Sequence, residues 1–201
     1  GVYTCDPNIC ENARRIDKIS YDEMLELASL GAKVLQTRSV EFGKKHNVPI
    51  LVKSSFTDEG GTLTTMEDED MEKEVVSGIT YDRNEARITL LGLQDRPGIA
   101  ATVFTALAEE NINVDMIIQN SSADGKSADL SFTVAKGDYD KANEILKKKA
   151  CELGARDVVG DTSIAKLSIV GVGMRSHAGV AARMFEALSK VGINIIMIST
   201  S

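Results

Sequence analysis

Residues 88–120, ITLLGLQDRPGIAATVFTALAEENINVDMIIQN, are matched later in the chain by residues 167–201, LSIVGVGMRSHAGVAARMFEALSKVGINIIMISTS. Identical residues recur in the same order: Gly92 and Gly171, Gly98 and Gly179, Phe104 and Phe185, Ile112 and Ile193, Asn113 and Asn194. The second copy carries two extra residues at the turn before its helix. A spacing of about 80 residues is too long for a solenoid repeat and indicates a duplicated small domain.

Each copy predicts a strand, a turn, a helix and a second strand, because two apolar strand-type runs flank a helical pattern. The stretch between the copies predicts a strand, a helix and a further strand, at 128–135, 139–153 and 157–160. The first repeat, residues 84–161, is therefore expected to fold as βαββαβ, the ferredoxin-like α+β arrangement.

The second repeat is expected at residues 164–201 together with residues 75–82. Its pattern stops after the second strand, and the apolar segment at 75–80 is expected to add a strand to its sheet. The chain also begins with Gly and ends inside an apolar run, which suggests a piece cut at both ends.

Residues 1–56 predict a layer of a different kind. Ser20 and Glu23 have the spacing of a capping box before an apolar helix, which Gly31 ends. A second helix is expected at 38–45 and a short buried strand at 49–53. Helices that alternate with a strand indicate the end of an α/β layer.

Residues 57–74, TDEGGTLTTMEDEDMEKE, are expected to form an acidic linker. This segment holds 1 basic and 8 acidic side chains, whereas the two flanking regions are almost neutral in a chain of net charge −7. Neither flank has the basic face that binding to a phosphate backbone needs. Aromatic residues make up 4% of the chain and Trp is absent, which also disfavours a nucleic-acid partner.

The three cysteines, Cys5, Cys10 and Cys151, lack metal-type spacing and are expected to be free thiols in a reducing compartment. No apolar run reaches the ~18–20 residues of a membrane span, and no signal-peptide pattern opens the chain. The expectation is a cytoplasmic protein without a membrane partner.

The turn DRPG at 95–98 ends a strand, opens a helix and is the main candidate binding site. The unpaired N–H groups beyond Gly98 attract an anion. With Asp95 beside them, they suit a free α-amino acid, whose carboxylate meets the amides and whose ammonium meets Asp95. Asn113 and Gln119 are candidates to read its side chain. The alternative is that Asp95 only caps the helix and Gly98 only permits packing.

Other polar residues give weaker signals. In the matching turn of the second repeat, Ser176 can cap the helix but brings no charge, and His177 and His46 are expected to be exposed loop residues. Lys33, after a Gly break, can meet a phosphate or can be a solvated surface side chain. The sequence contains no P-loop pattern, no nucleophile–base pair and no metal-ligand cluster.

Six segments together resemble aspartate kinase: GVYTCDP (1–7), DKISYDEMLELASLGAKVL (17–35), NVPILVKSSF (47–56), LGLQDRPGIAA (91–101), NINVDMIIQN (111–120) and GINIIMISTS (192–201). The resemblance covers the whole chain. It implies the C-terminal part of an amino-acid-kinase domain at 1–56, followed after the linker by tandem ACT regulatory domains.

The resemblance implies a nucleotide site that includes Tyr3, Asp6, Lys33 and Val34. Asn8 stands where the family usually has Arg, and Gln36-Thr37 stand where it often has His-Pro. The family's Lys-Phe-Gly-Gly block is not in this sequence, so no catalytic residue is assigned, and the chain alone is not expected to phosphorylate aspartate.

The resemblance also implies an effector pocket, often completed across a subunit interface. The matching positions are Asp95, Arg96, Pro97, Gly98, Ile99, Ala100, Asn113, Val114, Asp115, Gln119, Asn194 and Ile195.

The intact enzyme is expected to transfer the γ-phosphoryl group of MgATP to the β-carboxylate of L-aspartate, the first step of lysine, threonine and methionine biosynthesis. L-Threonine, L-lysine or both are the expected feedback inhibitors, and the ACT domains are expected to form a homo-oligomer such as a dimer. Two alternatives stay open. One is a non-catalytic amino-acid-binding subunit that starts at Met71. The other is a bifunctional kinase–homoserine dehydrogenase, which nothing in the sequence supports.

Overall fold

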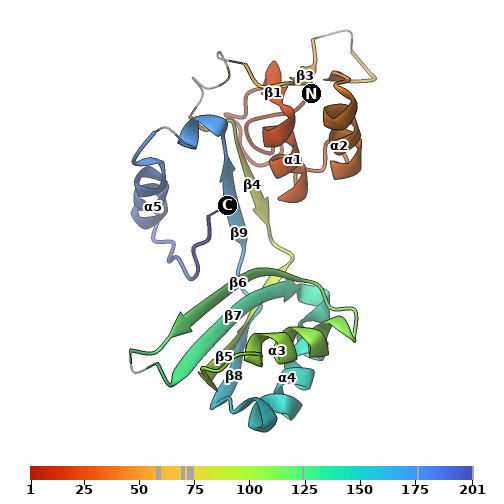
Figure 1. Ribbon diagram of the computed structural model, residues 1–201. Coiled ribbons are helices and arrows are strands. Elements are labelled where there is room, and N and C mark those ends of the chain that lie inside the picture. Colours follow the sequence, from red (N-terminus) through yellow and green to blue (C-terminus); the bar gives the residue numbers. More distant parts are fainter. Residues whose placement is uncertain (58–59, 69–70, 72–74, 124, 176, 201) are drawn as a thin grey trace. The chain divides into compact units, whose positions relative to one another are not determined.

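The first repeat forms a four-stranded sheet with two helices in a computed structural model, which describes residues 1–57, 60–68, 71, 75–123, 125–175 and 177–200. The chain divides into two units (Figure 1). Unit 1 comprises Gly1–Asp82 and Leu167–Asn194, and unit 2 comprises Arg83–Lys166 and Ile195–Ser201. Each unit is described separately below.

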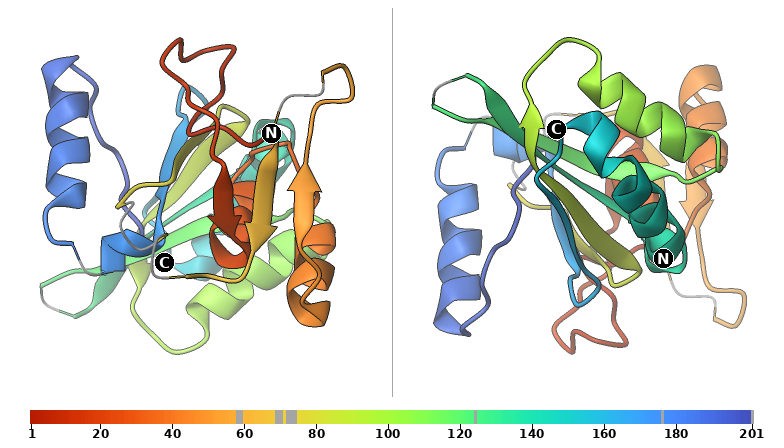
Figure 2. Two further views of the ribbon diagram at one scale, coloured as in Figure 1. Left: turned by 90° about the horizontal axis from the view of Figure 1, so that it is seen from above. Right: turned by 90° about the horizontal axis from the view of Figure 1, so that it is seen from below.

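Unit 2 contains the whole first repeat. Its elements follow in the order β5 (Glu85–Gln94), α3 (Ile99–Ala108), β6 (Val114–Ser121), β7 (Ser127–Ala135), a 3-10 turn η2 (Lys136–Asp138), α4 (Tyr139–Leu153) and β8 (Asp157–Asp161). The strands lie in the order β6-β7-β5-β8, and all three pairings are antiparallel. This is the ferredoxin-like order, and both helices cover one face of the sheet (Figures 1 and 2).

The core of unit 2 lies between that sheet and the two helices. Its fully buried side chains come from β5, α3, β7 and α4, and they include Ile88, Leu90, Val103, Leu107, Leu130, Phe132 and Leu146. The rings of Phe104 and Phe132 pack in an edge-to-face arrangement with centroids 5.4 Å apart. Burial of each such side chain contributes about 1.5–3 kcal/mol, which explains why the apolar periodicity of the sequence located these elements correctly.

The N-terminal part of unit 1 is a small α/β layer. It contains β1 (Lys18–Ser20), α1 (Tyr21–Ser29), α2 (Thr37–His46), β2 (Ile50–Val52) and β3 (Thr62–Thr65). The sheet order is β1-β3-β2, with β1 parallel and β2 antiparallel to β3. The predicted capping box at the start of α1 is confirmed, because Ser20 and Glu23 bond to each other's backbone amides.

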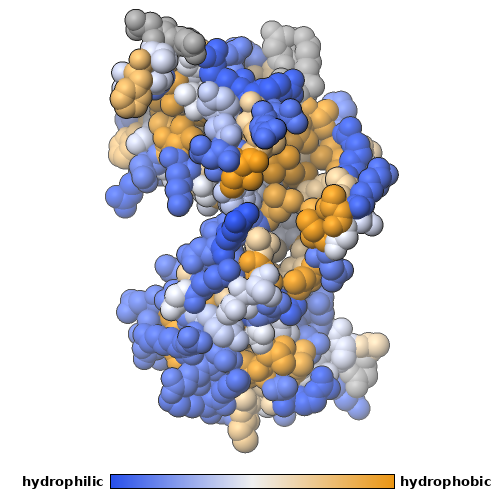
Figure 3. All heavy atoms as spheres, turned by 180° about the vertical axis from the view of Figure 1, so that it is seen from behind, coloured by the Kyte–Doolittle hydropathy of each residue, from blue (hydrophilic) through white to orange (hydrophobic). Residues whose placement is uncertain are grey.

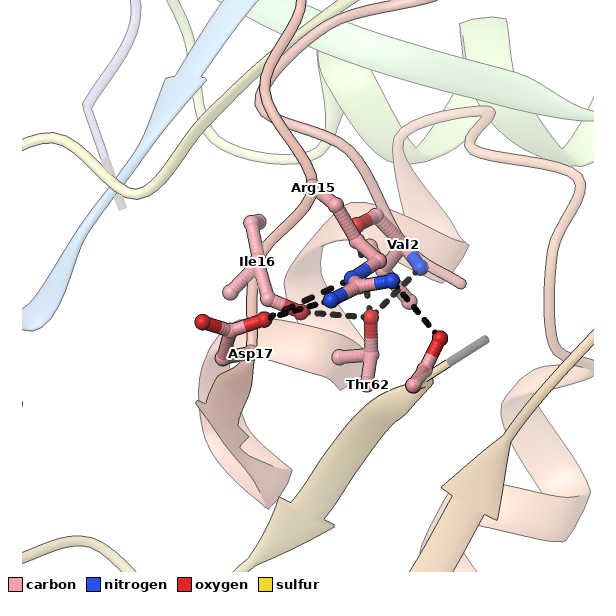
Figure 4. Close-up of polar contacts among 6 residues, drawn as sticks. Val2, Arg15, Ile16, Asp17 and Thr62 are labelled. Atoms are coloured by element: carbon pink, nitrogen blue, oxygen red, sulfur yellow. Dashed lines mark hydrogen bonds and ion pairs between the residues drawn. The ribbon is translucent and has the colours of Figure 1, made fainter. Parts of the chain in front are cut away.

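The predicted linker at 57–74 is wrong for residues 62–65, which form β3, the central strand of this sheet. Thr62 and Thr64 are fully buried. The Thr62 hydroxyl accepts from the Val2 amide (2.7 Å) and donates to the Ile16 carbonyl (2.6 Å), as Figure 4 shows. Polar side chains hide this strand from a hydrophobicity pattern. Residues 58–59, 69–70 and 72–74 of the predicted linker lie outside the described residues.

The second repeat contributes β9 (Lys166–Val170), a 3-10 turn η3 (Val172–Arg175) and α5 (Val180–Lys190). The segment after the linker forms β4 (Gly78–Asp82), and β4 pairs with β9 in a two-stranded sheet. The glycines matched between the repeats are the N-caps of α3 and α5, with φ of 91° at Gly98 and 88° at Gly179. The two turns therefore use the same left-handed backbone, which glycine adopts without a steric penalty.

The predicted second strand of this repeat, within residues 192–201, is not formed in the described residues 192–200. A strand needs a neighbour that satisfies its backbone groups, and the described residues give this segment none. Apolar side chains of this tail remain exposed, namely Val191, Ile193, Ile196 and Ile198. Hydrophobic atoms reach the surface on the face drawn in Figure 3. Among the described residues no helix is long and apolar enough to cross a bilayer.

Candidate nucleotide and effector sites

The first predicted nucleotide segment is a loop that returns on itself. Tyr3 forms an antiparallel bridge with Arg15, and the Thr4 amide donates to the Arg14 carbonyl (2.9 Å). Val2, directly before them, is buried and held by the Thr62 hydroxyl (Figure 4). The Tyr3 side chain is 38% exposed. The buried β3 strand therefore anchors a loop whose aromatic side chain faces solvent.

Asp6 organises the turn after this bridge. Its Oδ1 accepts from the Asn8 amide (2.9 Å) and from Asn8 Nδ2 (3.0 Å), and its carbonyl accepts from the amides of Ile9 and Cys10. Asn8, which replaces the expected Arg, thus stabilises the turn. Asp6 Oδ2 accepts from the Tyr81 hydroxyl at 3.4 Å.

The thiols of this loop are free, as is that of Cys151. Burial raises the pKa of the Cys5 thiol, and the neighbouring Cys10 thiol raises it further. Cys5 therefore stays protonated near neutral pH. In the part of the chain that the structure describes, no three His, Cys, Asp or Glu side chains gather as a metal site would require.

Lys33 and Val34 lie in the connection between α1 and α2. The helix ends at Ser29, and the Ala32 amide still donates to the Leu27 carbonyl (2.9 Å). Both predicted nucleotide residues are exposed here, three or four positions before α2 begins at Thr37. The N-cap of α2, Gln36, makes no side-chain cap bond.

The Asp95 turn is open at the start of α3. Its N-cap is Gly98, and Asp95 does not cap the helix, so that alternative is wrong. Among the described residues the Asp95 carboxylate has no hydrogen-bond or ion-pair partner, and the amides of Ala100 and Ala101 have no acceptor. Its own backbone is fixed, because the Asp95 amide donates to the Lys126 carbonyl (3.2 Å).

The predicted effector residues of unit 2 divide between the two ends of the sheet. Gln119 pairs with Leu130 on the half of β6 that reaches the Asp95 end, where β5 finishes and β7 starts. Asn113 and Val114 lie at the opposite end, since Val114 pairs with Val134. Asp115 lies there too and is ion-paired with Lys166, which also faces Glu85 at 3.6 Å.

The two effector residues predicted from the second repeat lie shortly after α5, in the C-terminal tail. Asn194 is the last residue of unit 1 and Ile195 belongs to unit 2. Ser176 lies outside the described residues, and a ring nitrogen of the exposed His177 is hydrogen-bonded to the Gly173 carbonyl (2.8 Å). A depression of about 340 Å³ lies between α3 and α4, and no predicted effector residue lines it.

Three long-range polar contacts were not predicted from the sequence. Glu23 does more than close the capping box, because its carboxylate also accepts from Ser77 and from the amide of Val172. Tyr81 reaches Asp6 from β4. These pairs are separated by 54 to 149 residues, and no local pattern carries such a signal.

Family models place both parts of the chain. A model of the amino acid kinase family matches residues 1–54, and a model of the ACT domain matches residues 88–149 and 167–201. The fold and these matches define a protein with part of an amino acid kinase domain and ACT repeats.

Known aspartokinases, or parts of them, are similar to this chain. The aspartokinase of Pseudomonas aeruginosa is 56% identical over 203 residues, which cover 100% of this chain and 49% of that protein. The crystal structure of the regulatory subunit of aspartate kinase from Thermus thermophilus is 44% identical, with a TM-score of 0.58 over 64% of this chain and 83% of that one. The structure of E. coli aspartokinase III in complex with lysine and aspartate is 29% identical, with a TM-score of 0.73 over 100% of this chain and 43% of that one.

The chain belongs to the aspartokinase family. It spans about half the length of the curated relatives that it matches.

Proposed function

We propose that this chain is the regulatory region, with the adjoining end of the catalytic domain, of a feedback-regulated aspartate kinase. The observation that carries the proposal is its 56% identity to a curated aspartokinase over the whole chain. The whole protein would transfer the γ-phosphoryl group of MgATP to L-aspartate. In such transfers the protein mainly positions the reactants and neutralises charge.

In this proposal the exposed Tyr3, Lys33 and Val34 contribute to the nucleotide site, with Asp6 shaping the loop. A Lys ammonium is a suitable point charge for a phosphate group. The Asp6 carboxylate is occupied by Asn8 and Tyr81, so its role is to hold the loop.

The Asp95 turn is the proposed effector site. An α-amino acid would place its carboxylate at the amides of Ala100 and Ala101, which have no acceptor among the described residues. Its ammonium would meet the Asp95 carboxylate, a charge-assisted contact. Lysine is the first candidate, because lysine is bound in the structure of E. coli aspartokinase III. Threonine is the second, from the resemblance of the turn.

Titration calorimetry of this chain with lysine and with threonine tests the effector site. Wild type is expected to bind one of them, and Asp95→Asn is expected to weaken that binding about 10- to 100-fold through loss of a charged hydrogen bond. Asp138→Asn is a matched control, since Asp138 is an acidic residue beside another helix start of the same unit. Equal affinity in wild type and Asp95→Asn would contradict the assignment.

A regulatory subunit without catalytic activity is a second candidate, favoured by the 44% identity to the Thermus thermophilus regulatory subunit. Expression of the complete gene separates the two functions. A single product that forms ADP only when both ATP and aspartate are present supports the kinase, and a short product that starts at Met71 and binds the effector supports the subunit.

A further inference from the structure

Strand β4 is fixed to the second repeat. It pairs with β9, and just before it the Ser77 amide donates to the Val170 carbonyl (2.8 Å). Beyond β9, Gly171 lies directly against the backbone of 75–77. A Cβ at position 171 would stand 2.4 Å from the Val75 carbonyl oxygen, so the two chain segments cannot move independently there.

The same strand is bonded to the first predicted nucleotide segment and to the end of α1, shortly before the second. The Ile79 amide donates to the Thr4 carbonyl (2.8 Å), and the Tyr81 hydroxyl donates to Asp6 Oδ2 (3.4 Å). Between them, the Thr80 hydroxyl donates to the Leu30 carbonyl (3.1 Å), directly before the connection that carries Lys33. Successive residues of β4 thus contact the Thr4–Asp6 loop and the end of α1.

Glu23 joins the three elements around β4. Glu23 is only 3% exposed. Among the described residues, every group hydrogen-bonded to its carboxylate is a donor. Oε2 accepts from the Ser20 amide (3.3 Å) and hydroxyl (3.0 Å), whereas Oε1 accepts from the Ser77 hydroxyl and the Val172 amide (3.1 Å). A buried carboxylate needs all these donors, so α1, the entry to β4 and the exit from β9 are held together.

Hydrophobic packing joins the same three elements, α1, β4 and β9. Val170 of β9 is buried in the same hydrophobic cluster as Met24 and Leu27 of α1. A Cβ at Gly78 would stand 2.9 Å from Leu27 Cδ2, so β4 and α1 are in close contact. Close-packed segments of this kind change position together rather than separately.

We propose that β4, locked by Glu23, is the element through which the second repeat acts on the nucleotide segments, and that Glu23 and Tyr81 are positioning residues for the Thr4–Asp6 loop. The proposal rests on the proposed function for the identity of those segments. A shift of β9 against α1 reaches the Thr4–Asp6 loop through Ile79 and Tyr81, and it reaches the Lys33 connection through Thr80.

Hydrogen–deuterium exchange of this chain without any ligand is the first test. Gly171→Ala pushes β9 away from residues 75–77, and it is expected to speed exchange in peptides covering 1–10 and 30–36 roughly three- to tenfold, the effect of losing one ordinary hydrogen bond. Gly137→Ala is the control, because a Cβ there meets nothing within 4 Å and the backbone at Gly137 is not left-handed. Unchanged exchange at 1–10 and 30–36 in a folded Gly171→Ala protein overturns the proposal.

Milder variants decide the matter if Gly171→Ala does not fold. Glu23→Gln is the first of these, because it keeps the side-chain shape. Its control is Glu26→Gln, which changes the same residue type on the exposed face of the same helix. Tyr81→Phe is expected to speed exchange at 1–10 and to leave 30–36 unchanged. Its control is Tyr21→Phe, which removes a buried hydroxyl that has no partner among the described residues. Equal behaviour of each variant and its control contradicts the proposal.

The same exchange experiment with a bound amino acid separates coupling between the effector site and the nucleotide segments from simple stabilisation of the fold. Lysine or threonine, whichever calorimetry shows to bind, is expected to alter exchange at 1–10 in wild type. Glu23→Gln is expected to bind it with the same affinity but to lose that remote change, and a remote change that persists in Glu23→Gln overturns the proposal. If neither amino acid binds wild type, the proposed effector site fails, and the ligand-free arm still decides the role of β4.

Discussion

Thr62 and Thr64 have the same side chain, lie two residues apart on β3 and are both fully buried, yet their hydroxyls differ. The Thr62 hydroxyl bonds to Val2 and Ile16. That of Thr64 has no partner among the described residues. A hydroxyl that is buried costs free energy unless it is bonded, so these two residues are opposite cases of one rule.

Thr62→Val is therefore expected to lower the free energy of unfolding by about 1–3 kcal/mol, because it leaves the Val2 amide without its acceptor. Thr64→Val is expected to be neutral or stabilising, since it removes an unbonded polar group of nearly the same shape. Urea unfolding of the two variants measures the difference. A larger loss for Thr64→Val would contradict this account of β3.

A second residue-scale prediction concerns Asp161 at the end of β8. Its pKa lies below the ordinary value, chiefly because the Ser163 hydroxyl (2.6 Å) and amide (2.8 Å) donate to Oδ1. A carboxyl pKa that folding lowers stabilises the protein above the unfolded-state pKa, and this contribution is lost as pH falls through the folded-state value.

Ser163→Ala is expected to raise the Asp161 pKa towards its ordinary value, as NMR titration of the side-chain carboxyl carbon would show. The stability difference between Ser163→Ala and wild type should shrink as pH falls through that range. Glu144, whose pKa is lowered by the Lys148 ammonium, should titrate identically in both proteins. A shift of Glu144 as well would indicate a global effect of the substitution.

At the scale of elements, the sequence located the helices and strands that apolar periodicity and capping residues determine. The elements of the first repeat and the capping box of α1 follow from local patterns. β3 was missed because its buried residues are threonines beside an acidic run, and their burial depends on bonds to Val2 and Ile16, which are distant in sequence. The expected strand in the tail failed for a related reason, since a strand also needs a partner.

The candidate sites divide in the same way. The turn at Asp95 is a local feature, and the sequence predicted its open helix start. The contacts of Asp6 with Tyr81 and of Glu23 with Val172 depend on the tertiary fold, so no spacing rule finds them. The family resemblance placed Asp115 in the effector pocket, which stays a prediction, and its ion pair with Lys166 depends on the tertiary fold.

The glycine pair before β3 gives a prediction at this scale. A Cβ at Gly61 would stand 2.3 Å from the Val52 carbonyl oxygen, so Gly61→Ala must separate β2 from β3. Overpacking of this kind costs about 1–3 kcal/mol. At the neighbouring Gly60 the nearest atom is 3.3 Å away on the Arg15 side chain, and Gly60→Ala is expected to change stability by less than about 0.5 kcal/mol. Chemical denaturation of the pair checks the contrast, and equal losses would contradict it.

At the scale of the whole molecule, the described residues form two hydrophobic clusters, one in each unit. Units with separate hydrophobic cores can unfold as separate cooperative events. The second repeat shares its core with the N-terminal segment, as Val170 shows, although it is matched in sequence to the first repeat.

Scanning calorimetry is therefore expected to resolve two transitions. Leu107→Ala should lower the midpoint temperature of the unit 2 transition only, and Met24→Ala that of unit 1 only. Each substitution of a fully buried side chain should reduce the free energy of unfolding of its unit by about 2–5 kcal/mol. A single transition that both variants shift equally would contradict the independence of the two cores.

The bond between Glu23 and the Val172 amide spans 149 positions of the chain, and this distance has a consequence during synthesis. At ribosomal rates of about 5–20 residues per second, roughly 7–30 s pass between the emergence of the carboxylate and that of its last donor. The whole first repeat, residues 84–161, emerges in that interval and has the elements it needs for its sheet. Until then the N-terminal layer lacks the Val172 donor to its Glu23 carboxylate and lacks Val170 in its core. We therefore expect nascent chains that stall before residue 170 to bind chaperones.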